Sequence, residues 1–292
     1  MSARSASTSD TRNAWLWMSP AALLFLAVVL IPLVMTLLLT FYSWNSTAGI
    51  VPGFSLHNWH EVLSDSYYLK VFSRTFWYSL AATALTLVVG VPEAIIVNRM
   101  GATWRRFCLL IILGPLLVSV VARTLGWLLL FGGANGVVNQ ALMALGVISH
   151  PIPFMFTPWG TIIALAHVLM PFMVLSVSAA LQRLNPKIGD AATSLGATHW
   201  TVMRRIILPQ IMPGILAGTI MVFALAASSF ATPAIIGGRR LAVASTAIYD
   251  EFTNTLNWPL GAVIAVTLLL ALVGIIAGSN RLIERCFPEA FR

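Results

Sequence analysis

Residues 185–209 read NPKIGDAATSLGATHWTVMRRIILP and separate two long apolar runs, at 161–181 and 206–230. This is the longest polar interruption in the C-terminal half that still has the pattern of a folded segment. A polar segment between two apolar runs of this length is expected at a membrane surface, where the flanking runs leave and re-enter the bilayer.

The segment carries the sequence signals of two short helices. Asn185 can cap the first helix, and Pro186 suits a first helical position, where no backbone N–H is needed. Gly196 is suited to end that helix, and Thr198 can cap a second one that continues into the next apolar run. The sequence therefore predicts a helix, a bend and a second helix within 185–209.

The overall composition is that of a membrane protein. Of the 292 residues, 59% are hydrophobic and only 9% are charged, whereas soluble domains have about 25% charged residues. The net charge of +8 is attributed to basic loops that face anionic lipid, and no nucleic-acid partner is expected. Cys108 and Cys286 have no metal-ligand spacing and are expected to be reduced, structural thiols.

Six apolar runs are long enough to cross a bilayer, since about 20 apolar residues span the hydrocarbon. They are continuously apolar rather than alternating, which favours helices over a β-barrel. The expected fold is an all-α, polytopic membrane helix bundle, with an N-terminal tail at 1–14, a transmembrane domain at 15–285 and a C-terminal tail at 286–292. The expected spans are at about 15–42, 72–97, 107–131, 159–182, 206–231 and 259–282.

The distribution of Lys and Arg indicates the orientation of the bundle. With the N-terminus inside, the inner segments contain twelve of these residues, and the outer segments contain only Lys70, Arg74, Arg239 and Arg240. Because cytoplasmic loops carry the excess of Lys and Arg, both termini and the 185–205 loop are expected in the cytoplasm.

Within the first predicted helix, Asp190 is followed by Ala191 and Ala192. Small side chains allow another surface to approach the helix backbone, and an acidic side chain can pair with a basic partner. On these residues alone, an ordinary amphipathic connector between membrane helices is an equally good interpretation.

The longer pattern, Asp190-Ala191-Ala192, three residues, Gly196, nine residues and Ile206-x-Leu208-Pro209, resembles the EAA loop of binding-protein-dependent ABC importer permeases. The family usually has Glu at the first position, and this chain has the shorter Asp. In the family, the loop is a coupling helix that sits in a cleft of the cytoplasmic ATPase. The resemblance implies ATPase-coupling roles for Asp190, Ala191, Ala192, Leu195, Gly196, Arg204 and Arg205.

Other segments extend the resemblance over residues 15–285. VARTLGW at 121–127, followed by NGVVN at 135–139, resembles the Arg-Thr, Trp and Asn-Gly-x-x-Asn pattern of polyamine-type permeases. FATPAIIGG at 230–238 resembles their Phe-x-Thr-Pro-x-x-x-Gly-Gly segment, and NWP at 257–259 is similar too. The chain thus resembles the spermidine/putrescine permease subfamily, first-subunit type. The resemblance implies a place in the solute path or gate for Arg123, Trp127, Asn135, Asn139, Phe230, Thr232 and Pro233.

The function implied by the resemblance is that of a permease subunit of an ATP-driven importer in the bacterial inner membrane. The solute would be a small organic molecule, a polyamine such as spermidine or putrescine, received from a periplasmic binding protein. The expected partners are an ABC ATPase dimer, that binding protein and a second homologous permease that forms a heterodimer with this chain. The sequence has no Walker A pattern, so the ATPase is expected to bind ATP and Mg²⁺, and this chain no cofactor.

Three alternatives stay open at this point. Relatives of the subfamily are linked to opines, amino-acid-like compounds and organic anions, so the same importer class could serve another solute. A stand-alone secondary transporter would need buried ion-coupling groups, and the spans offer only Arg123, Glu93 and His167. An intramembrane hydrolase would have to use Ser176 or Ser178 with His167, but Ser178 and His167 are separated by about three helical turns.

The two charges inside the spans are expected at different depths. Glu93 is about 9 Å from the cytoplasmic end of its span and Arg123 about 24 Å from that end of the next, so they should not pair. Glu93, where the family usually has an apolar residue, is expected to meet the basic cluster of Arg99, Arg105 and Arg106. Arg123 needs another partner and is either an anchor of the fold or part of the solute path.

Overall fold

The computed structural model describes residues 8–286, with the side chains of 8–17, Pro186, Asp190 and 282–286 outside that description. The expected terminal tails therefore lie mostly beyond the described residues. The described chain is helical apart from one short two-stranded hairpin. Five helices are long and apolar enough to cross a membrane, and a sixth span exists if one bent pair is counted as one. The expected all-α, polytopic fold is confirmed.

The long helices are α1 (Thr8–Leu39), α3 (Ser66–Arg99), α7 (Pro158–Gln182), α10 (Leu208–Ser228) and α12 (Trp258–Cys286). The shorter helices are α2 (His57–Ser64), α4 (Ala102–Leu113), η1 (Gly114–Leu117), α5 (Val120–Phe131), η2 (Gly133–Asn135), α6 (Val137–Ala144), α8 (Pro186–Ser194), α9 (His199–Val202), η3 (Met203–Ile207), η4 (Pro233–Gly237), η5 (Arg239–Leu241) and α11 (Ala244–Thr253). The antiparallel hairpin joins β1 (Ser43–Asn45) to β2 (Gly49–Val51), with Trp44 opposite Ile50.

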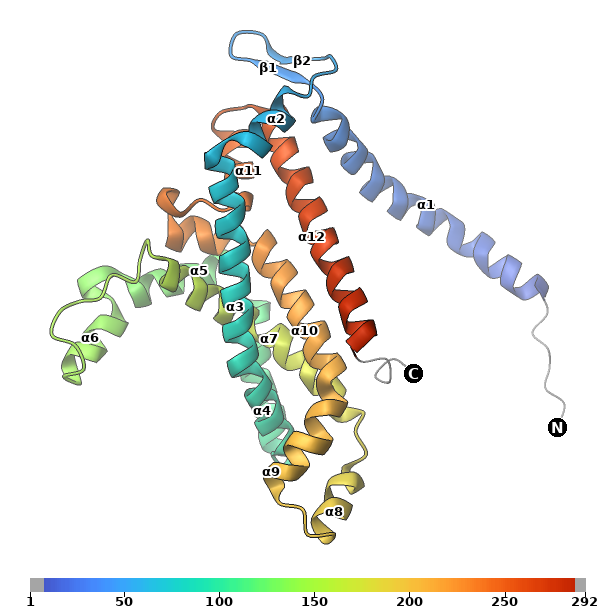
Figure 1. Cartoon of the computed structure of the whole chain (residues 1–292), viewed down its shortest axis with the longest axis vertical. Helices are drawn as coiled ribbons and strands as arrows, with labels where there is room; N and C mark the ends of the chain where they lie inside the picture. Colours follow the sequence, from blue (N-terminus) through green and yellow to red (C-terminus); the bar gives the residue numbers. More distant parts are fainter. Residues whose placement is uncertain (1–7, 287–292) are drawn as a thin grey trace.

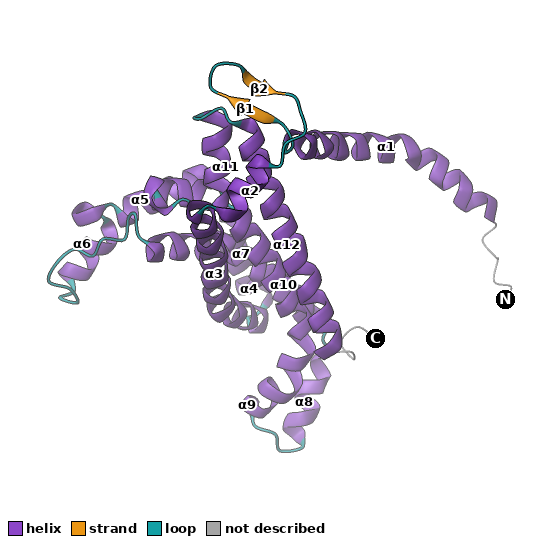
Figure 2. Cartoon of the chain, turned by 45° about the horizontal axis from the view of Figure 1, so that its top comes forward, coloured by secondary structure: helices purple, strands orange, loops and turns teal. Residues whose placement is uncertain are grey.

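Helices α3, α7 and α10 lie side by side at the centre of the bundle (Figures 1 and 2). Buried apolar side chains fill their contact, among them Val91, Leu169, Met173 and Ile211. Because lipid tails are as apolar as these side chains, such helices associate through close packing and polar contacts rather than through the hydrophobic effect. The three helices form the rigid body from which the other elements extend.

Glycines in α10 allow it to approach α7 closely. A Cβ atom added at Gly214 would lie 2.5 Å from the Ala180 Cβ and 3.0 Å from the Ser176 carbonyl oxygen. The Ser176 hydroxyl donates a 2.7 Å hydrogen bond to the Gly214 carbonyl oxygen. One turn later, a Cβ at Gly218 would meet the Met173 sulfur at 2.9 Å. The α7–α10 contact therefore depends on small residues and on one interhelical hydrogen bond.

Buried hydroxyl groups along α3 are satisfied by the backbone of their own helix. Thr75, Ser79, Thr83 and Thr86 each donate a 2.7 Å hydrogen bond to the carbonyl oxygen four residues earlier. This matters in a bilayer, where no water pairs with buried polar atoms. The Thr75 oxygen also accepts a 2.8 Å hydrogen bond from the backbone N–H of Ala244, which fixes the start of α11 against α3.

The span expected at 107–131 is not one continuous helix. Helices α4 and α5 meet at a bend of 103°, and Val118 and Ser119 between them have extended ψ angles of 139° and 137°. Pro115 in η1 has no N–H to donate, so the helical ladder is already weakened at this point. As a result α5 and α6 project sideways from the bundle, as both views show (Figures 1 and 2).

Helix α1 leaves the bundle on another side. Among its described side chains, from Met18 to Leu39, none is buried, and it meets the body of the protein near α12 (Figure 1). A helix that is apolar on every side is suited to lipid or to another membrane chain.

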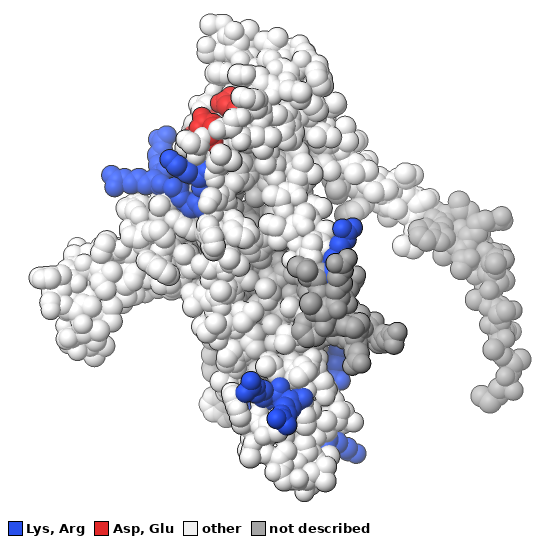
Figure 3. Space-filling model, viewed as in Figure 1, with Lys and Arg blue, Asp and Glu red and all other residues white. Residues whose placement is uncertain are grey.

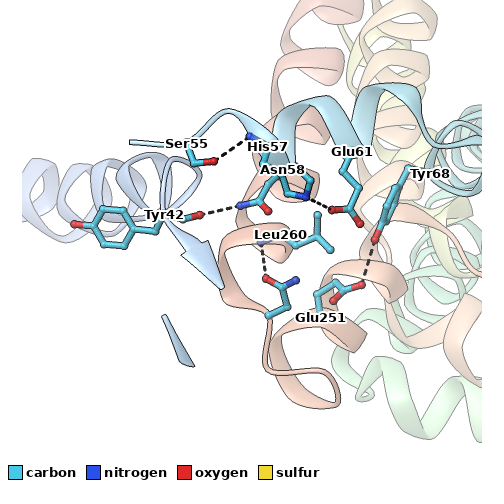
Figure 4. Close-up of polar contacts among 9 residues, drawn as sticks. Tyr42, Ser55, His57, Asn58, Glu61, Tyr68, Glu251 and Leu260 are labelled. Carbon is cyan, nitrogen blue, oxygen red and sulfur yellow. Dashed lines mark hydrogen bonds and ion pairs between the residues drawn. The ribbon is translucent and has the colours of Figure 1, made fainter. Parts of the chain in front are cut away.

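The end of the bundle that carries the hairpin, α2 and α11 is held by polar contacts (Figure 4). The Asn58 amide donates to the Tyr42 carbonyl oxygen at 2.9 Å, and the Tyr68 hydroxyl donates to Glu251 Oε1 at 3.4 Å. Beneath them α2, α3, α11 and α12 share an apolar cluster that includes Val62. We call this the α2–α11 end, and the opposite one the α8–α9 end.

We expect Gly214→Ala to destabilise the protein by about 1–3 kcal/mol, because the added methyl group overpacks the α7–α10 contact. The free energy of unfolding in detergent, from a denaturant titration, would measure this. Gly278→Ala in α12 is the matched control, since nothing lies within 4 Å of a Cβ there. It should be neutral or gain up to about 1 kcal/mol in helix propensity. Equal stabilities of the two variants would contradict this account of the packing.

Candidate functional site

The predicted helix–bend–helix at 185–205 is present at the tip of the α8–α9 end (Figure 1). The Asn185 side chain accepts a 3.0 Å hydrogen bond from the Lys187 N–H, and Thr198 Oγ1 accepts one at 3.3 Å from the Thr201 N–H. Gly196 has a φ of +87°, in the left-handed region that favours glycine. Both predicted caps and the predicted bend are confirmed. Such features could be predicted because they depend only on the local sequence.

The bend displays apolar side chains to the surroundings. Leu195 is 90% exposed and Trp200 is 71% exposed, while Ala191 is exposed and Ala192 is half-buried. Large exposed apolar side chains on a polar loop indicate a contact surface for another protein. Asp190 lies in α8, just before Ala191. The arrangement therefore offers a small apolar surface on a short helix, as a docking element would.

Arg204 and Arg205 are exposed on η3, a wide helical turn just after α9. Figure 3 shows basic side chains on this part of the surface, with others at the far end of the molecule, beside acidic ones. Below the bend, Val202 is buried and lies 3.8 Å from the Cβ position of Gly189, so that α8 rests on α9. Through η3 the loop continues directly into α10.

Three of the sequence-predicted path residues lie where α5 meets the core. The Trp127 indole N–H donates a 3.3 Å hydrogen bond to His167 Nδ1 on α7, and the two rings pack edge to face. Arg123, one turn before Trp127, is the charged neighbour of the same histidine. Thr124 is fully buried, and its hydroxyl oxygen lies 3.4 Å from that of Thr232, just before η4.

The Arg123 side chain is half-buried, and part of its guanidinium has no partner in the described part of the chain. Its Nε and Nη1 atoms are buried and have no hydrogen-bond partner there. Helices α4 and η1 together cover Ala102–Leu117, which rises about 24 Å before the chain turns sideways, so the bend changes the direction of the chain and leaves the expected depth of Arg123 nearly unchanged.

Thr232, just before η4, and Pro233, its first residue, are buried, whereas Phe230 is exposed and packs on Tyr249 with ring centroids 4.7 Å apart. Phe230 and Tyr249 line a cavity of about 350 Å³ at the α2–α11 end, together with Tyr67, Asp250, Asn254 and Arg239. The sequence interpretation did not assign Tyr67, Tyr249 or Asp250 to a site. Aromatic and acidic residues on the outer segments were the signal that could have identified them.

The two asparagines of the NGVVN segment have different surroundings. Asn135 is exposed on η2. Asn139 is fully buried: its amide nitrogen donates to the carbonyl oxygens of Gly133 and Ile152, both at 2.8 Å, and its Oδ1 accepts from the Ile152 N–H at 3.0 Å. The Asn139 amide is therefore used to close the 133–152 loop, and no polar atom of it is left for a solute.

Glu93 does not meet the basic cluster that the sequence suggested. Its Oε2 is buried without a hydrogen-bond partner, and no ion pair joins it to Arg99, Arg105 or Arg106 in the described chain.

At the α2–α11 end, burial raises the pKa of the Glu251 carboxyl above its ordinary value. That carboxylate accepts hydrogen bonds from Thr255 at 2.5 Å and from Tyr68.

Comparison with known proteins shows the family to which this chain belongs. Residues 90–285 match the family described as "Binding-protein-dependent transport system inner membrane component", and the chain belongs to it. It is 32% identical over 244 residues to the spermidine/putrescine transport system permease protein PotB of Escherichia coli (strain K12), covering 84% of this chain and 88% of that one. It is 29% identical over 264 residues to PotB of Haemophilus influenzae, covering 88% and 90%.

Solved structures agree with the fold. A bacterial ABC transporter involved in the import of the acidic polysaccharide alginate has a chain that matches with a TM-score of 0.76 at 19% identity, covering 95% of this chain and 98% of that chain. The same kind of transporter in complex with alginate pentasaccharide-bound periplasmic protein matches with a TM-score of 0.79 at 18% identity. The chain is thus a multi-pass inner-membrane permease component of an ABC importer and not an enzyme.

We expect Asn139→Ala to open the 133–152 loop, because three hydrogen bonds at about 1 kcal/mol each are lost and buried backbone groups are left unpaired. Limited proteolysis of the protein in detergent should show faster cleavage within the loop. Asn135→Ala, at an exposed position four residues earlier, should be cleaved at the wild-type rate. Equal cleavage of both variants would contradict the structural role of Asn139.

Proposed function

We propose that this chain is the permease subunit of an importer that takes up a polyamine such as spermidine or putrescine. The PotB proteins, named for spermidine/putrescine transport, are similar to it over most of its length. The 350 Å³ cavity is consistent with an organic cation, because Asp250 supplies a carboxylate and Tyr67, Phe230 and Tyr249 supply aromatic faces. The likeness to PotB is the observation on which this proposal chiefly rests.

The proposed assembly has two permeases, two ATPases and one periplasmic binding protein. The excess of Lys and Arg near the α8–α9 end supports an orientation with that end in the cytoplasm. The ATPase dimer would then grip the bend at Leu195 and Gly196, and the binding protein would dock on the α2–α11 end. The second permease is proposed to be a different but homologous chain.

Coupling would follow the path of one helix. Closing of the ATPase dimer displaces α8 and α9, and η3 joins α9 to α10 without a loop. Helix α10 ends at Ser228, two residues before Phe230 and the cavity. Rigid-body movement of α10 against α7 therefore links the cytoplasmic contact to the cavity, and the cavity opens to receive the solute.

A second candidate solute is an amino-acid-like compound. The same cavity is lined by Arg239 as well as by Asp250. A cation opposite a carboxylate suits a molecule that carries both a carboxylate and an ammonium group, whereas a polyamine has no use for Arg239. The two residues thus provide a direct means of telling the two candidates apart.

Uptake into proteoliposomes that contain the whole importer, its binding protein and ATP would identify the solute. We expect labelled spermidine to be imported, and Asp250→Asn to lower uptake about tenfold at limiting solute, the effect of losing about 1.4 kcal/mol of binding. Arg239→Gln should leave spermidine uptake unchanged. Import of a labelled amino acid in place of spermidine, with both variants impaired, would establish the second candidate and refute the first.

Leu195→Asp should abolish solute-stimulated ATP hydrolysis, because a charged side chain would replace the apolar one that contacts the ATPase. The protein should stay folded, because the Leu195 side chain is 90% exposed in the free chain. Leu195→Met, which keeps the apolar surface, is the matched control and should retain coupling. ATPase activity of the reconstituted complex, with and without solute-loaded binding protein, measures both. Normal stimulation in the Asp variant would remove the bend from the ATPase contact.

A further inference from the structure

The cavity at the α2–α11 end is bordered by a short segment that joins η4 to α11. This segment, residues 238–243, contains the single turn η5, and we call it the η5 loop. Gly238, Arg239 and Ala242 of this loop line the cavity. The turn is closed by a hydrogen bond from the Leu241 N–H to the Gly238 carbonyl oxygen, which is long at 3.4 Å. The position of the loop therefore depends on its contacts with other elements.

Arg74 on α3 ties the end of the η5 loop to the bundle. Its Nη1 atom donates a 2.9 Å hydrogen bond to the Ala242 carbonyl oxygen and a 3.4 Å one to that of Arg240. The next residue of α3, Thr75, accepts the 2.8 Å hydrogen bond from the Ala244 N–H. Two adjacent residues of one helix thus hold the end of the loop and the start of α11, the helix that forms one wall of the cavity.

The start of the η5 loop is held by packing. Gly238 has a φ of +60°, and a Cβ atom at this position would lie 2.8 Å from the Phe156 ring. The Phe156 N–H donates a 2.8 Å hydrogen bond to the Ile236 carbonyl oxygen, so the chain just before α7 lies directly against η4. The loop is therefore fixed at its start by close backbone contact and at its end by the guanidinium of Arg74.

Arg74 is close to the cavity without lining it. It follows Tyr67 by seven residues on the same face of α3, and both Arg74 and Asp250 are charged neighbours of that tyrosine. As a charge alone, Arg74 would repel a polyamine in the cavity. Its hydrogen bonds to the loop act in the opposite sense, because they hold in place the backbone that surrounds the solute. Removal of the charge therefore has opposite effects on solute affinity in the two cases.

We propose that Arg74 is a positioning residue that holds the η5 loop against α3 and so sets how tightly the cavity binds its solute. This inference rests on the proposed function, since it takes the cavity as the solute site. Arg suits the role because its guanidinium stays protonated and has several N–H donors in a fixed plane. A wall that is already in place loses no freedom when the solute arrives, and affinity rises accordingly.

Equilibrium binding of labelled spermidine to the permease–ATPase complex in nanodiscs, without the binding protein, measures the affinity of the cavity. We expect Arg74→Gln to raise the Kd about tenfold, because the solute must then order the loop as it binds. Arg74→Lys, which keeps a cationic donor, should recover most of the affinity. Lys70→Gln is the matched control, since it removes an exposed cation one turn earlier on α3, and it should bind as the wild type does.

Amide hydrogen exchange of the same complexes, without solute, measures the hold on the loop directly. Peptides that cover 238–244 should exchange faster in Arg74→Gln than in the wild type or Lys70→Gln. Unchanged exchange, unchanged or tighter spermidine binding by Arg74→Gln, or equal losses of affinity in Arg74→Gln and Lys70→Gln would each overturn the inference. If the wild type binds no spermidine, the cavity is not the polyamine site of the proposed function, and the exchange rates still decide whether Arg74 holds the loop.

Discussion

The close contact between α7 and α10 is the constraint on which the rest of the structure depends. Gly214 and Gly218 remove the side chains that would otherwise separate the two backbones, and Ser176 ties them with one hydrogen bond. Because α10 follows the coupling loop through α9 and η3 and ends two residues before Phe230 of the cavity, its position against α7 helps to determine where both are placed. A chain in lipid obtains this precision from small residues and not from a water-driven collapse.

Some polar groups in the spans have all their hydrogen-bond partners within the described chain, and others do not. The buried Ser and Thr hydroxyls of α3 donate to the backbone of their own helix, and Thr75 and Thr86 also bond to α11 and α7, so these groups are satisfied within the bundle and stabilise it. Arg123 and Glu93 have enclosed, unsatisfied atoms in the described chain. A membrane protein keeps such groups where another molecule completes them.

Much of the fold and of the coupling loop could be predicted from the sequence, because the relevant signals are local. Span lengths follow from apolar runs, and the caps at Asn185 and Thr198 and the bend at Gly196 each involve residues within one or two turns. The break before α5 could not be predicted, since a lone Pro115 is tolerated in many membrane helices and the bend depends on how α5 packs against η4. The role of Asn139 was also hidden, because its partner Ile152 is a whole loop away. The cavity joins Tyr67 of α3 to Asp250 of α11, which only the folded chain brings together.

The wide helical turns η3 and η4 have a mechanical consequence. One precedes α10 and the other begins five residues after it ends, at Pro233. A turn of this kind hydrogen-bonds to the fifth residue instead of the fourth, and such turns are frequent at functional sites. Helix α10 is thus bounded at each end by an irregular turn, and a shift of α10 together with α7 can be taken up in these turns without unwinding the helix itself.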